Sequence, residues 1–385
     1  MIAGRDVRVP GLAYSRPNPS RLARFWQMGN SVCNLLFSAA GAPKTLVSGG
    51  RLAYLAGEVE YFTGDLLPNA FHFLCRRQPF FILSGTGPAA AIASLTGCDA
   101  VPAPKLRLST HCAVVIIANW NACPAVLHYG VCGEARAEIR RAARGLVIAA
   151  SDPRLKHLIP SLAFSGPASD GAALMVQSRV PGVSPGFSWR RVDATAELWL
   201  AGPPARAVAG RPRLGQELTE VYDTFPAYRD SLSRAGTALL GWHAQSRMAG
   251  DITHGDLWLG NVLFSGDAVA GIVDWEWART DGVRSADLLH LILMSYSELR
   301  GTHVAHYLRQ LWADTIGDRA LKERLETLRL RVGMDTDDLK FVALLRWFDY
   351  LRENAQRGRL PGRAWSENVI SRTLPVIRDW LRRHD

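Results

Sequence analysis

The alternation and helical spacing of apolar residues are clearest in the middle of the chain. Residues 262–264 (VLF) and 269–275 (VAGIVDW) are apolar and rich in β-branched side chains, and the turn-forming run SGDA joins them, which predicts a β-hairpin. Upstream, residues 226–247 predict a helix that ends before Gly250. Its helically spaced apolar residues are Leu232, Ala235, Leu239 and Trp242. We therefore expect a loop between this helix and the hairpin.

The N-terminal half predicts short strands and one helix. A first strand is expected around Leu106. The other elements are strands at residues 111–120 and 124–130, a helix at 134–150 and a buried strand at 171–182 that ends in Pro and Gly. Residues 1–100 alternate short apolar runs with Gly and Pro. Their function cannot be assigned from the sequence.

The C-terminal third predicts helices. Residues 280–296 favour a loop and a buried helix. Residues 337–354 and 365–383 carry Arg on one side and Leu, Val, Ile and Trp on the other, as amphipathic helices do.

The composition of the chain limits the cellular compartments and the classes of binding partner that we expect. No apolar run is long enough to cross a bilayer, and the N-terminus lacks the apolar core of a signal peptide, so we expect a cytoplasmic protein without a membrane partner. The six cysteines lie within the first 132 residues and none has zinc-site spacing, which favours reduced thiols. Of the net charge of +10, residues 1–178 hold most, with 17 Lys and Arg against 9 Asp and Glu. Binding of nucleic acid would require a basic stripe with interleaved aromatic residues, and the sequence shows none. We therefore expect no nucleic-acid partner and attribute the excess of basic residues to a basic nucleotide-binding cleft.

Three residues between positions 253 and 278 have the spacing that phosphoryl transfer requires. Asp256, on the expected loop, can accept the proton of an attacking hydroxyl. Asn261, five residues later, and Asp274, at the end of the hairpin, can hold Mg²⁺ against nucleotide phosphates. The hairpin would bring these two oxygen ligands together.

At these residues the chain resembles the aminoglycoside phosphotransferase and choline kinase family. The match consists of His254, Gly255, Asp256, Asn261 and the run Ile272, Val273, Asp274. The resemblance implies ATP or GTP and Mg²⁺ as cofactors and a small-molecule hydroxyl as acceptor. His254 is assigned a structural role in holding the loop, and Asp287 stands where the family has an aspartate that braces the catalytic region.

The resemblance also implies a fold class and a domain division. We expect an α+β, two-lobed protein-kinase-like fold, with a small antiparallel-sheet lobe and a larger, mainly helical lobe. Residues 1–100 would be an N-terminal extension packed on the small lobe or part of it. Residues 101–180 would form the nucleotide-binding lobe, and residues 181–385 the catalytic and acceptor-binding lobe.

The nucleotide-binding residues depart from the family pattern. Glu138 falls where the family has its helix glutamate, but His128 stands in place of the phosphate-gripping lysine. A protonated imidazole could serve in part, and a core histidine is an equally good interpretation, with Lys105 as the next candidate cation. Backbone groups near Ser178 and Val180 would pair with the adenine edge. The glycine-rich phosphate loop is missing, and Ser109 and Thr110 would take its place.

Three functions follow from these patterns. The leading one is an ATP- and Mg²⁺-dependent phosphotransferase whose acceptor is a sugar, nucleoside or related neutral metabolite. An aminoglycoside is a polycation and needs a surplus of acidic residues in its binding lobe. Residues 179–385 hold 28 Lys and Arg against 26 Asp and Glu, so they lack that surplus. The second is a catalytically weak or inactive nucleotide-binding protein. The third is a dinucleotide-dependent enzyme using Gly85, Gly87 and Ala90. Oligomeric state is not indicated.

Overall fold

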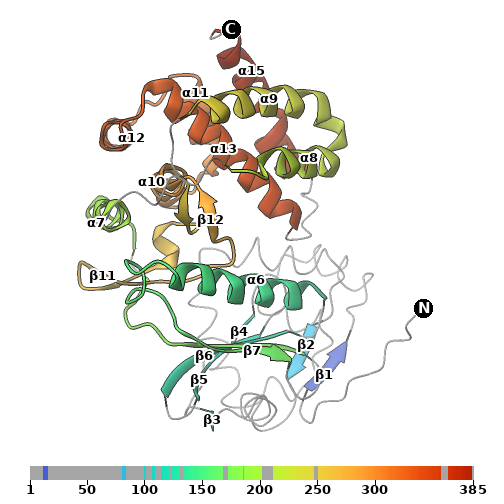
Figure 1. Ribbon diagram of the computed structural model, residues 1–385, viewed down its shortest axis with the longest axis vertical. Coiled ribbons are helices and arrows are strands. Elements are labelled where there is room, and N and C mark those ends of the chain that lie inside the picture. Colours follow the sequence, from blue (N-terminus) through green and yellow to red (C-terminus); the bar gives the residue numbers. More distant parts are fainter. Residues whose placement is uncertain are drawn as a thin grey trace, which may run out of the picture. The chain divides into compact units, whose positions relative to one another are not determined.

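The chain forms two compact units (Figure 1). The computed structural model describes residues 12–15, 80–83, 99–100, 106–108, 114–120, 123–130, 133–167, 172–184, 186–201, 211–246, 250–356 and 363–383. The first unit comprises residues 1–140 and 162–179, and the second comprises residues 141–161 and 180–385. Helix α6 (Gly133–Ala150) therefore begins in the first unit and ends in the second.

An antiparallel sheet is the main element described in the first unit. Its strands follow the order β3-β5-β6-β8-β7, and β4 pairs with β5. Their bounds are β3 Asp99–Ala100, β4 Leu106–Leu108, β5 Val114–Trp120, β6 Cys123–Gly130, β7 Leu162–Pro167 and β8 Ala173–Ser178. A separate pair joins β1 (Leu12–Ser15) to β2 (Phe80–Leu83). The expected strands are confirmed, although the one at 171–182 is shorter than expected.

Strand β6 shows why this part of the chain forms a sheet. Its side chains alternate, so that Ala125, Leu127 and Tyr129 are buried on one face while Val126 and His128 on the other face are half-buried. At the end of β6, a Cβ on Gly130 would lie 2.7 Å from the Cβ of Ala135 in α6. Glycine thus permits the helix to start close against the sheet.

The second unit is mainly helical, as expected. Its helices include α7 Trp189–Leu200, α8 Leu214–Thr224, α9 Arg229–Gln245, α10 Arg284–Arg300, α11 Val304–Trp312, α12 Arg319–Val332 and α13 Thr336–Gln356. Helices α10 and α13 are buried over most of their length and pack against each other. They correspond to the expected helices at 280–296 and 337–354. The α+β fold class is confirmed.

The expected continuous helix at residues 365–383 is wrong. The segment divides into α14 (Arg363–Ser366), a π-helical turn (Glu367–Ser371) and α15 (Leu374–Leu381). Pro375 lies in the first turn of α15. Because proline lacks the N–H that would continue a helix from before it, it favours a new helix start at this point.

Two antiparallel strand pairs frame the segment of chemical interest. The predicted hairpin is confirmed as β10 (Val262–Ser265) with β11 (Ala268–Ile272), and β9 (Asp251–Thr253) pairs with β12 (Arg279–Gly282). Strand β11 ends at Ile272 rather than at residue 275, because Asp274 has a φ of 66°, which a strand cannot accommodate. The loops at 254–261 and 273–278 therefore start and end at the same two strand pairs.

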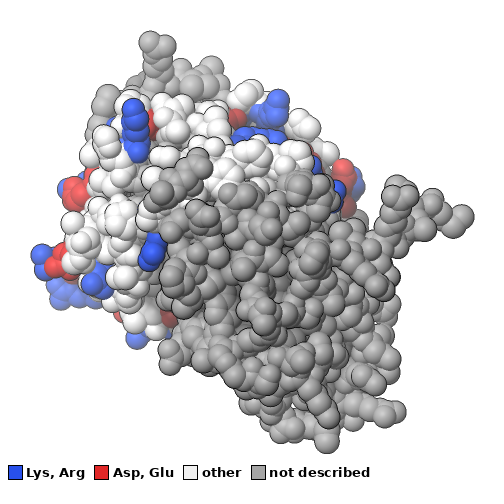
Figure 2. Space-filling view, turned by 90° about the horizontal axis from the view of Figure 1, so that it is seen from below, with Lys and Arg blue, Asp and Glu red and all other residues white. Residues whose placement is uncertain are grey.

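Two observations on the described residues bear on possible partners. No helix among the described residues is long and apolar enough to cross a membrane. On the described part of one face, basic and acidic side chains lie side by side (Figure 2). Exposed pairs such as Arg319 with Glu323 and Arg329 with Glu326 show the same mixing.

The second half of α6 packs against the residue that follows Asp274. A Cβ on Gly145 would lie 1.6 Å from the carbonyl oxygen of Trp275, whose own side chain is fully buried. We predict that Gly145→Ala lowers the free energy of unfolding by at least about 2 kcal/mol, because the helix must move away from a packed backbone. Urea unfolding would measure this loss.

Gly241→Ala is the matched control for this prediction. Gly241 also lies inside a helix, but nothing lies within 4 Å of a Cβ built on it, and the position is exposed. Alanine there should stabilise the protein by about 0.5 to 1 kcal/mol. Equal effects of the two substitutions would show that helix propensity, rather than contact with Trp275, decides the outcome at Gly145.

Candidate active site

His254 holds the loop between β9 and β10 in shape. Its Nε2 lies 2.8 Å from the carbonyl oxygen of Val273, and its Nδ1 lies 3.2 Å from the backbone nitrogen of Asp256. A carbonyl only accepts and an N–H only donates, so Nε2 carries the proton and Nδ1 accepts. Burial lowers the pKa of His254 to about 4, which keeps this neutral form. The imidazole thus joins Asp256 to the residue before Asp274.

Asp287, in the first turn of α10, braces the same loop. Its two carboxylate oxygens accept hydrogen bonds from the backbone nitrogens of His254 (2.6 Å) and Gly255 (2.9 Å). Burial raises the pKa of Asp287 to about 7, although these two bonds act in the opposite direction. Two turns further along α10, Ser295 Oγ accepts from the backbone nitrogen of Leu259 at 3.1 Å.

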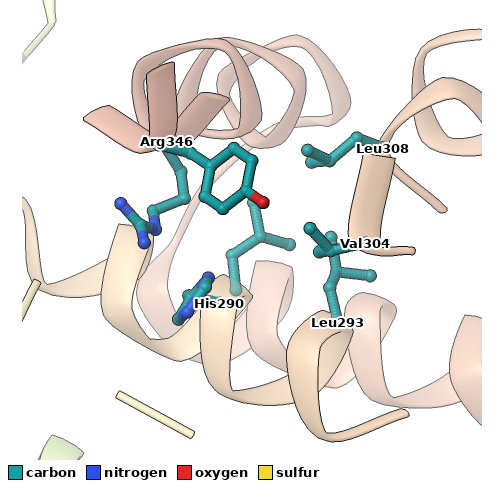
Figure 3. A pocket seen from close by; sticks show the side chains of 7 residues that line it. His290, Leu293, Val304, Leu308 and Arg346 are labelled. Carbon is teal, nitrogen blue, oxygen red and sulfur yellow. The ribbon is translucent and has the colours of Figure 1, made fainter. Parts of the chain in front are cut away.

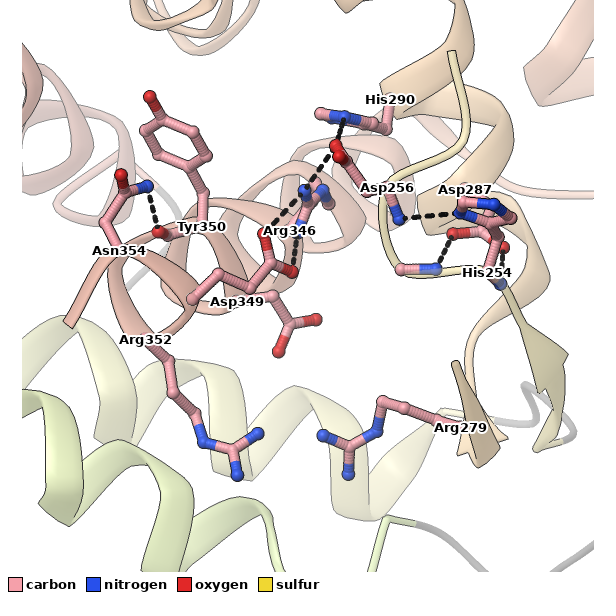
Figure 4. A network of polar contacts seen from close by, with 12 residues as sticks. His254, Asp256, Arg279, Asp287, His290, Arg346, Asp349, Tyr350, Arg352 and Asn354 are labelled. Atoms are coloured by element: carbon pink, nitrogen blue, oxygen red, sulfur yellow. Dashed lines mark hydrogen bonds and ion pairs between the residues drawn. The ribbon is translucent and has the colours of Figure 1, made fainter. Parts of the chain in front are cut away.

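Asp256 is held by two buried side chains from different helices (Figure 4). His290 of α10 places Nε2 2.9 Å from Asp256 Oδ1, and Arg346 of α13 places Nη2 4.0 Å from the same oxygen. Burial and the nearby Arg346 charge lower the pKa of His290 to about 4. A neutral imidazole therefore donates to the carboxylate, and a guanidinium lies just beyond hydrogen-bonding distance.

Asn261 and Asp274 approach each other through the peptide groups of Val273. The Val273 nitrogen donates to the Asn261 carbonyl oxygen at 2.9 Å, while the Val273 carbonyl accepts from His254. Asn261 Nδ2 donates to the Asp256 carbonyl oxygen at 2.9 Å. This bond uses the amide nitrogen and leaves the amide oxygen as an acceptor, and the Asp274 residue is exposed.

This donor set suits a magnesium ion. Mg²⁺ prefers oxygen ligands and retains several waters, so one carboxylate and one amide oxygen from the protein are sufficient alongside nucleotide phosphates. Among the described residues no group of three or more His, Cys, Asp or Glu could form a metal cage. The fit therefore rests on Asn261 and Asp274.

The residues after Asp274 are anchored to α6. Arg141 lies 3.4 Å from Glu276, and its guanidinium lies 4.9 Å above the ring of Trp277. The Trp275 indole lies 4.5 Å from the His254 ring and donates to the Ile272 carbonyl oxygen. Asp274 is thus the exposed residue of an otherwise well-packed turn.

The sequence-based nucleotide residues are only partly described. His128 Nε2 lies 3.3 Å from Gln177 Nε2, on neighbouring strands β6 and β8, and Glu138 is half-buried on α6. Ser178 ends β8, and after it the Arg179 nitrogen donates to the Pro124 carbonyl oxygen. Val180 begins the second unit's longer segment. The roles of these residues remain predictions; Ser109, Thr110, Lys105 and the Gly85, Gly87 and Ala90 run lie outside the described residues.

Solved structures and a family model both match this chain. A crystal structure of aminoglycoside phosphotransferase APH(4)-Ia shares 13% identity and a TM-score of 0.51, over 76% of this chain and 99% of that one. A thermostable mutant of that enzyme in complex with ADP and hygromycin B gives 13% identity and a TM-score of 0.50, with the same shares covered. At this identity the structures show the fold. No curated protein matches the sequence.

The family model decides the assignment. The model described as the phosphotransferase enzyme family matches residues 132–325, about half of the chain. This chain belongs to the phosphotransferase enzyme family. The resemblance that His254, Asp256, Asn261 and Asp274 indicated is therefore confirmed.

Beyond the family motif, the second unit contains a network of paired charges near Asp256. Arg346 donates to both oxygens of Glu353 (2.6 and 3.1 Å), and Arg211 forms a two-pronged pair with Asp349. Figure 4 shows Arg279 and Arg352 pointing toward each other. Both contact the buried carboxylate of Glu217, at 2.7 and 3.2 Å.

The sequence analysis missed His290 and Arg346. His290 follows Asp287 by three residues, which places it on the same face of α10, so the helical period was the available signal. Arg346 stands between Leu345 and Trp347 within a buried helix. A charge in such a run requires a partner, but the sequence does not say which one.

Several buried groups of this family member titrate abnormally. The pKa values of His254, His290 and His303 are lowered from 6.5 to about 4, in each case first by burial. Asp287 is raised from 3.8 to about 7. Between pH 6.5 and 4 the unfolded chain therefore binds three protons that the folded chain does not, and the folded chain keeps one on Asp287 that the unfolded chain loses. Over these four groups the net difference is 3 − 1 = 2 protons, and burial also lowers the pKa of His243, which acts in the same direction.

We predict that the protein loses stability as the pH falls from about 6.5 to 4. With two more protons bound in the unfolded state by these four groups, the free energy of unfolding should fall by about 3 kcal/mol per pH unit. Urea unfolding at several pH values measures the slope, and His303→Gln should reduce it by about one proton. A stability that is flat or rises toward pH 4 would show that these imidazoles are protonated in the fold.

Proposed function

We propose that this chain is an ATP- or GTP-dependent and Mg²⁺-dependent phosphotransferase that phosphorylates a hydroxyl group of a small, neutral molecule. One observation carries the proposal. The peptide groups of Val273 join the loop of Asp256 and Asn261 to Asp274 through hydrogen bonds of 2.8 and 2.9 Å. A proton acceptor and two metal ligands thereby belong to one rigid assembly.

In the proposed reaction Asp256 orients the acceptor hydroxyl and takes its proton. The hydroxyl oxygen forms a bond to the γ-phosphorus, the bond from that phosphorus to the β,γ-bridging oxygen breaks, and the nucleoside diphosphate leaves with that electron pair. Asn261 and Asp274 would hold Mg²⁺, which neutralises charge on the phosphates. His254 and Asp287 keep the loop in the shape this requires.

The paired charges of the second unit support a neutral acceptor. A polycation such as an aminoglycoside is best bound by carboxylates in excess over cations. In the charge network described above, the carboxylates of Glu353, Asp349 and Glu217 are each bonded to arginine. A cationic acceptor would have to displace these arginines, at the cost of leaving buried charges unpaired. A sugar, nucleoside or related metabolite avoids that cost.

We predict that Asp256→Asn reduces phosphoryl transfer by at least about a hundredfold while nucleotide affinity changes little, because the amide cannot take up the proton of the acceptor. Turnover and nucleotide binding are measured on the same preparation. Asp267→Asn is the control, since Asp267 is an exposed turn residue paired with the exposed Arg190. Near full turnover in Asp256→Asn would remove this carboxylate from the mechanism.

We predict that Asp274→Ala removes the dependence of nucleotide affinity on magnesium, because Asn261 alone lacks the negative charge that a hard cation prefers. Titration calorimetry with ATP, in Mg²⁺ and in chelator, measures this dependence, and Asp267→Ala serves as the control on the same hairpin. Equal affinity in both conditions for the unmodified protein would instead indicate a metal-independent, catalytically inactive site.

A further inference from the structure

One face of α10 holds the loop of Asp256 at three points. Asp287 accepts from the backbone of His254 and Gly255, His290 contacts the Asp256 carboxylate, and Ser295 accepts from Leu259. Residues at positions i, i+3 and i+8 of a helix lie along one stripe. Of these three contacts, that of His290 alone reaches the side chain that would take the proton.

The chemistry of the His290 contact is defined by its surroundings. The side chain is 4% exposed and lines a cavity of about 10 Å³. The other lining side chains are those of Arg346, Tyr350 and aliphatic residues that include Leu293, Val304 and Leu308 (Figure 3). The ring is neutral, and its N–H donates to a carboxylate that cannot donate in return.

Arg346 supplies the full positive charge that His290 lacks. It is 5% exposed, and its guanidinium is fixed by both oxygens of Glu353 one helical heptad further along α13. Burial alone would lower the pKa of Arg346, but Glu353 and Asp256 outweigh it and raise the value above its ordinary range. The charge lies 4.0 Å from Asp256 Oδ1, too far for a strong hydrogen bond.

We propose that His290 and Arg346 are positioning residues for Asp256: His290 fixes the rotation of the carboxylate through a neutral hydrogen bond, and Arg346, locked by Glu353, holds it ionised until the acceptor hydroxyl delivers its proton. This inference rests on the proposed function. A neutral donor orients the carboxylate with a smaller loss of basicity than a directly bonded cation would cause, and the Arg346 charge acts from 4.0 Å. The distribution of roles therefore keeps Asp256 both oriented and able to accept a proton.

The first test compares His290→Leu with His290→Gln. Leucine suits the aliphatic surroundings but donates no hydrogen bond, whereas the glutamine amide can place a donor near the position of Nε2. With MgATP as the probe and water or a neutral polyol as acceptor, we expect kcat to fall by about tenfold to a hundredfold in His290→Leu and to recover largely in His290→Gln, at unchanged MgATP affinity. Full kcat in a folded His290→Leu protein would overturn the proposal.

His303→Leu is the matched control. His303 is also dehydrated, with a pKa lowered to about 4, and donates through Nε2, but to Tyr350 rather than Asp256. Its loss should lower the thermal unfolding midpoint without lowering kcat. If both histidine variants lose kcat in proportion to their stability, His290 acts only on the fold and the proposal fails.

The role of Arg346 is tested with a variant that leaves no unpaired charge in the interior. Single replacement would strand Glu353, so the double variant Arg346→Met, Glu353→Leu replaces the buried pair by apolar groups, a change that folded proteins often tolerate. We expect a folded protein with lowered kcat and unchanged MgATP affinity. A folded double variant with full kcat would exclude Arg346.

A spectroscopic readout separates this inference from the proposed function. In protein labelled with ¹⁵N at histidine, the His290 ring should show a protonated Nε2 and a bare Nδ1, and Asp256→Asn should shift its signals while those of His303 stay in place. Unshifted His290 signals would overturn the inference whatever the enzyme does. If instead Asp256→Asn keeps full turnover, the proposed function fails; if it is inactive and His290→Leu is not, only the positioning role fails.

Discussion

The hydrogen bond from the neutral imidazole of His254 to the Val273 carbonyl is the constraint on which the rest of the candidate site depends. Through the other ring nitrogen the same side chain fixes the backbone of Asp256. The bond requires one particular tautomer, and complete burial enforces it by making a second proton too costly. A charged His254 could not accept from Asp256, and the two halves of the site would lose this link and keep the bond from the Val273 nitrogen to the Asn261 carbonyl oxygen.

The helices behind the site meet the cost of burying polar groups in two different ways. On α10, burial lowers the pKa of His290 and raises the pKa of Asp287. Both shifts favour the neutral form of the side chain, so little full charge enters the interior. α13 instead brings in full charges and pairs them, as Arg346 and Glu353 show. Paired buried charges contribute little net stability, but each partner becomes indispensable to the other. The side chains of α10 thus contact the loop of Asp256 without adding full charge, whereas the ion pair of α13 fixes the position of the Arg346 guanidinium.

The sequence predicted the parts of this molecule in which local pattern and chemistry coincide. The hairpin, the helix before it and the spacing of Asp256, Asn261 and Asp274 lie within one short stretch, so turn residues and β-branched runs were sufficient. The break before α15 could have been predicted from Pro375, whereas the contact of Arg346 with Asp256 could not. That contact joins residues 90 positions apart, and only packing of α13 against α10 brings them together.

The backbone of Asp274 has a consequence for any effort to make this protein more robust. With a φ of 66°, it occupies a left-handed conformation that most residues rarely adopt and that glycine, asparagine and aspartate adopt at lower cost. Replacement by glycine would remove the remaining strain, so directed evolution for heat resistance alone can select against this aspartate. Under the proposed function such variants would gain stability and lose a magnesium ligand, so a screen of this protein must score phosphoryl transfer together with survival on heating.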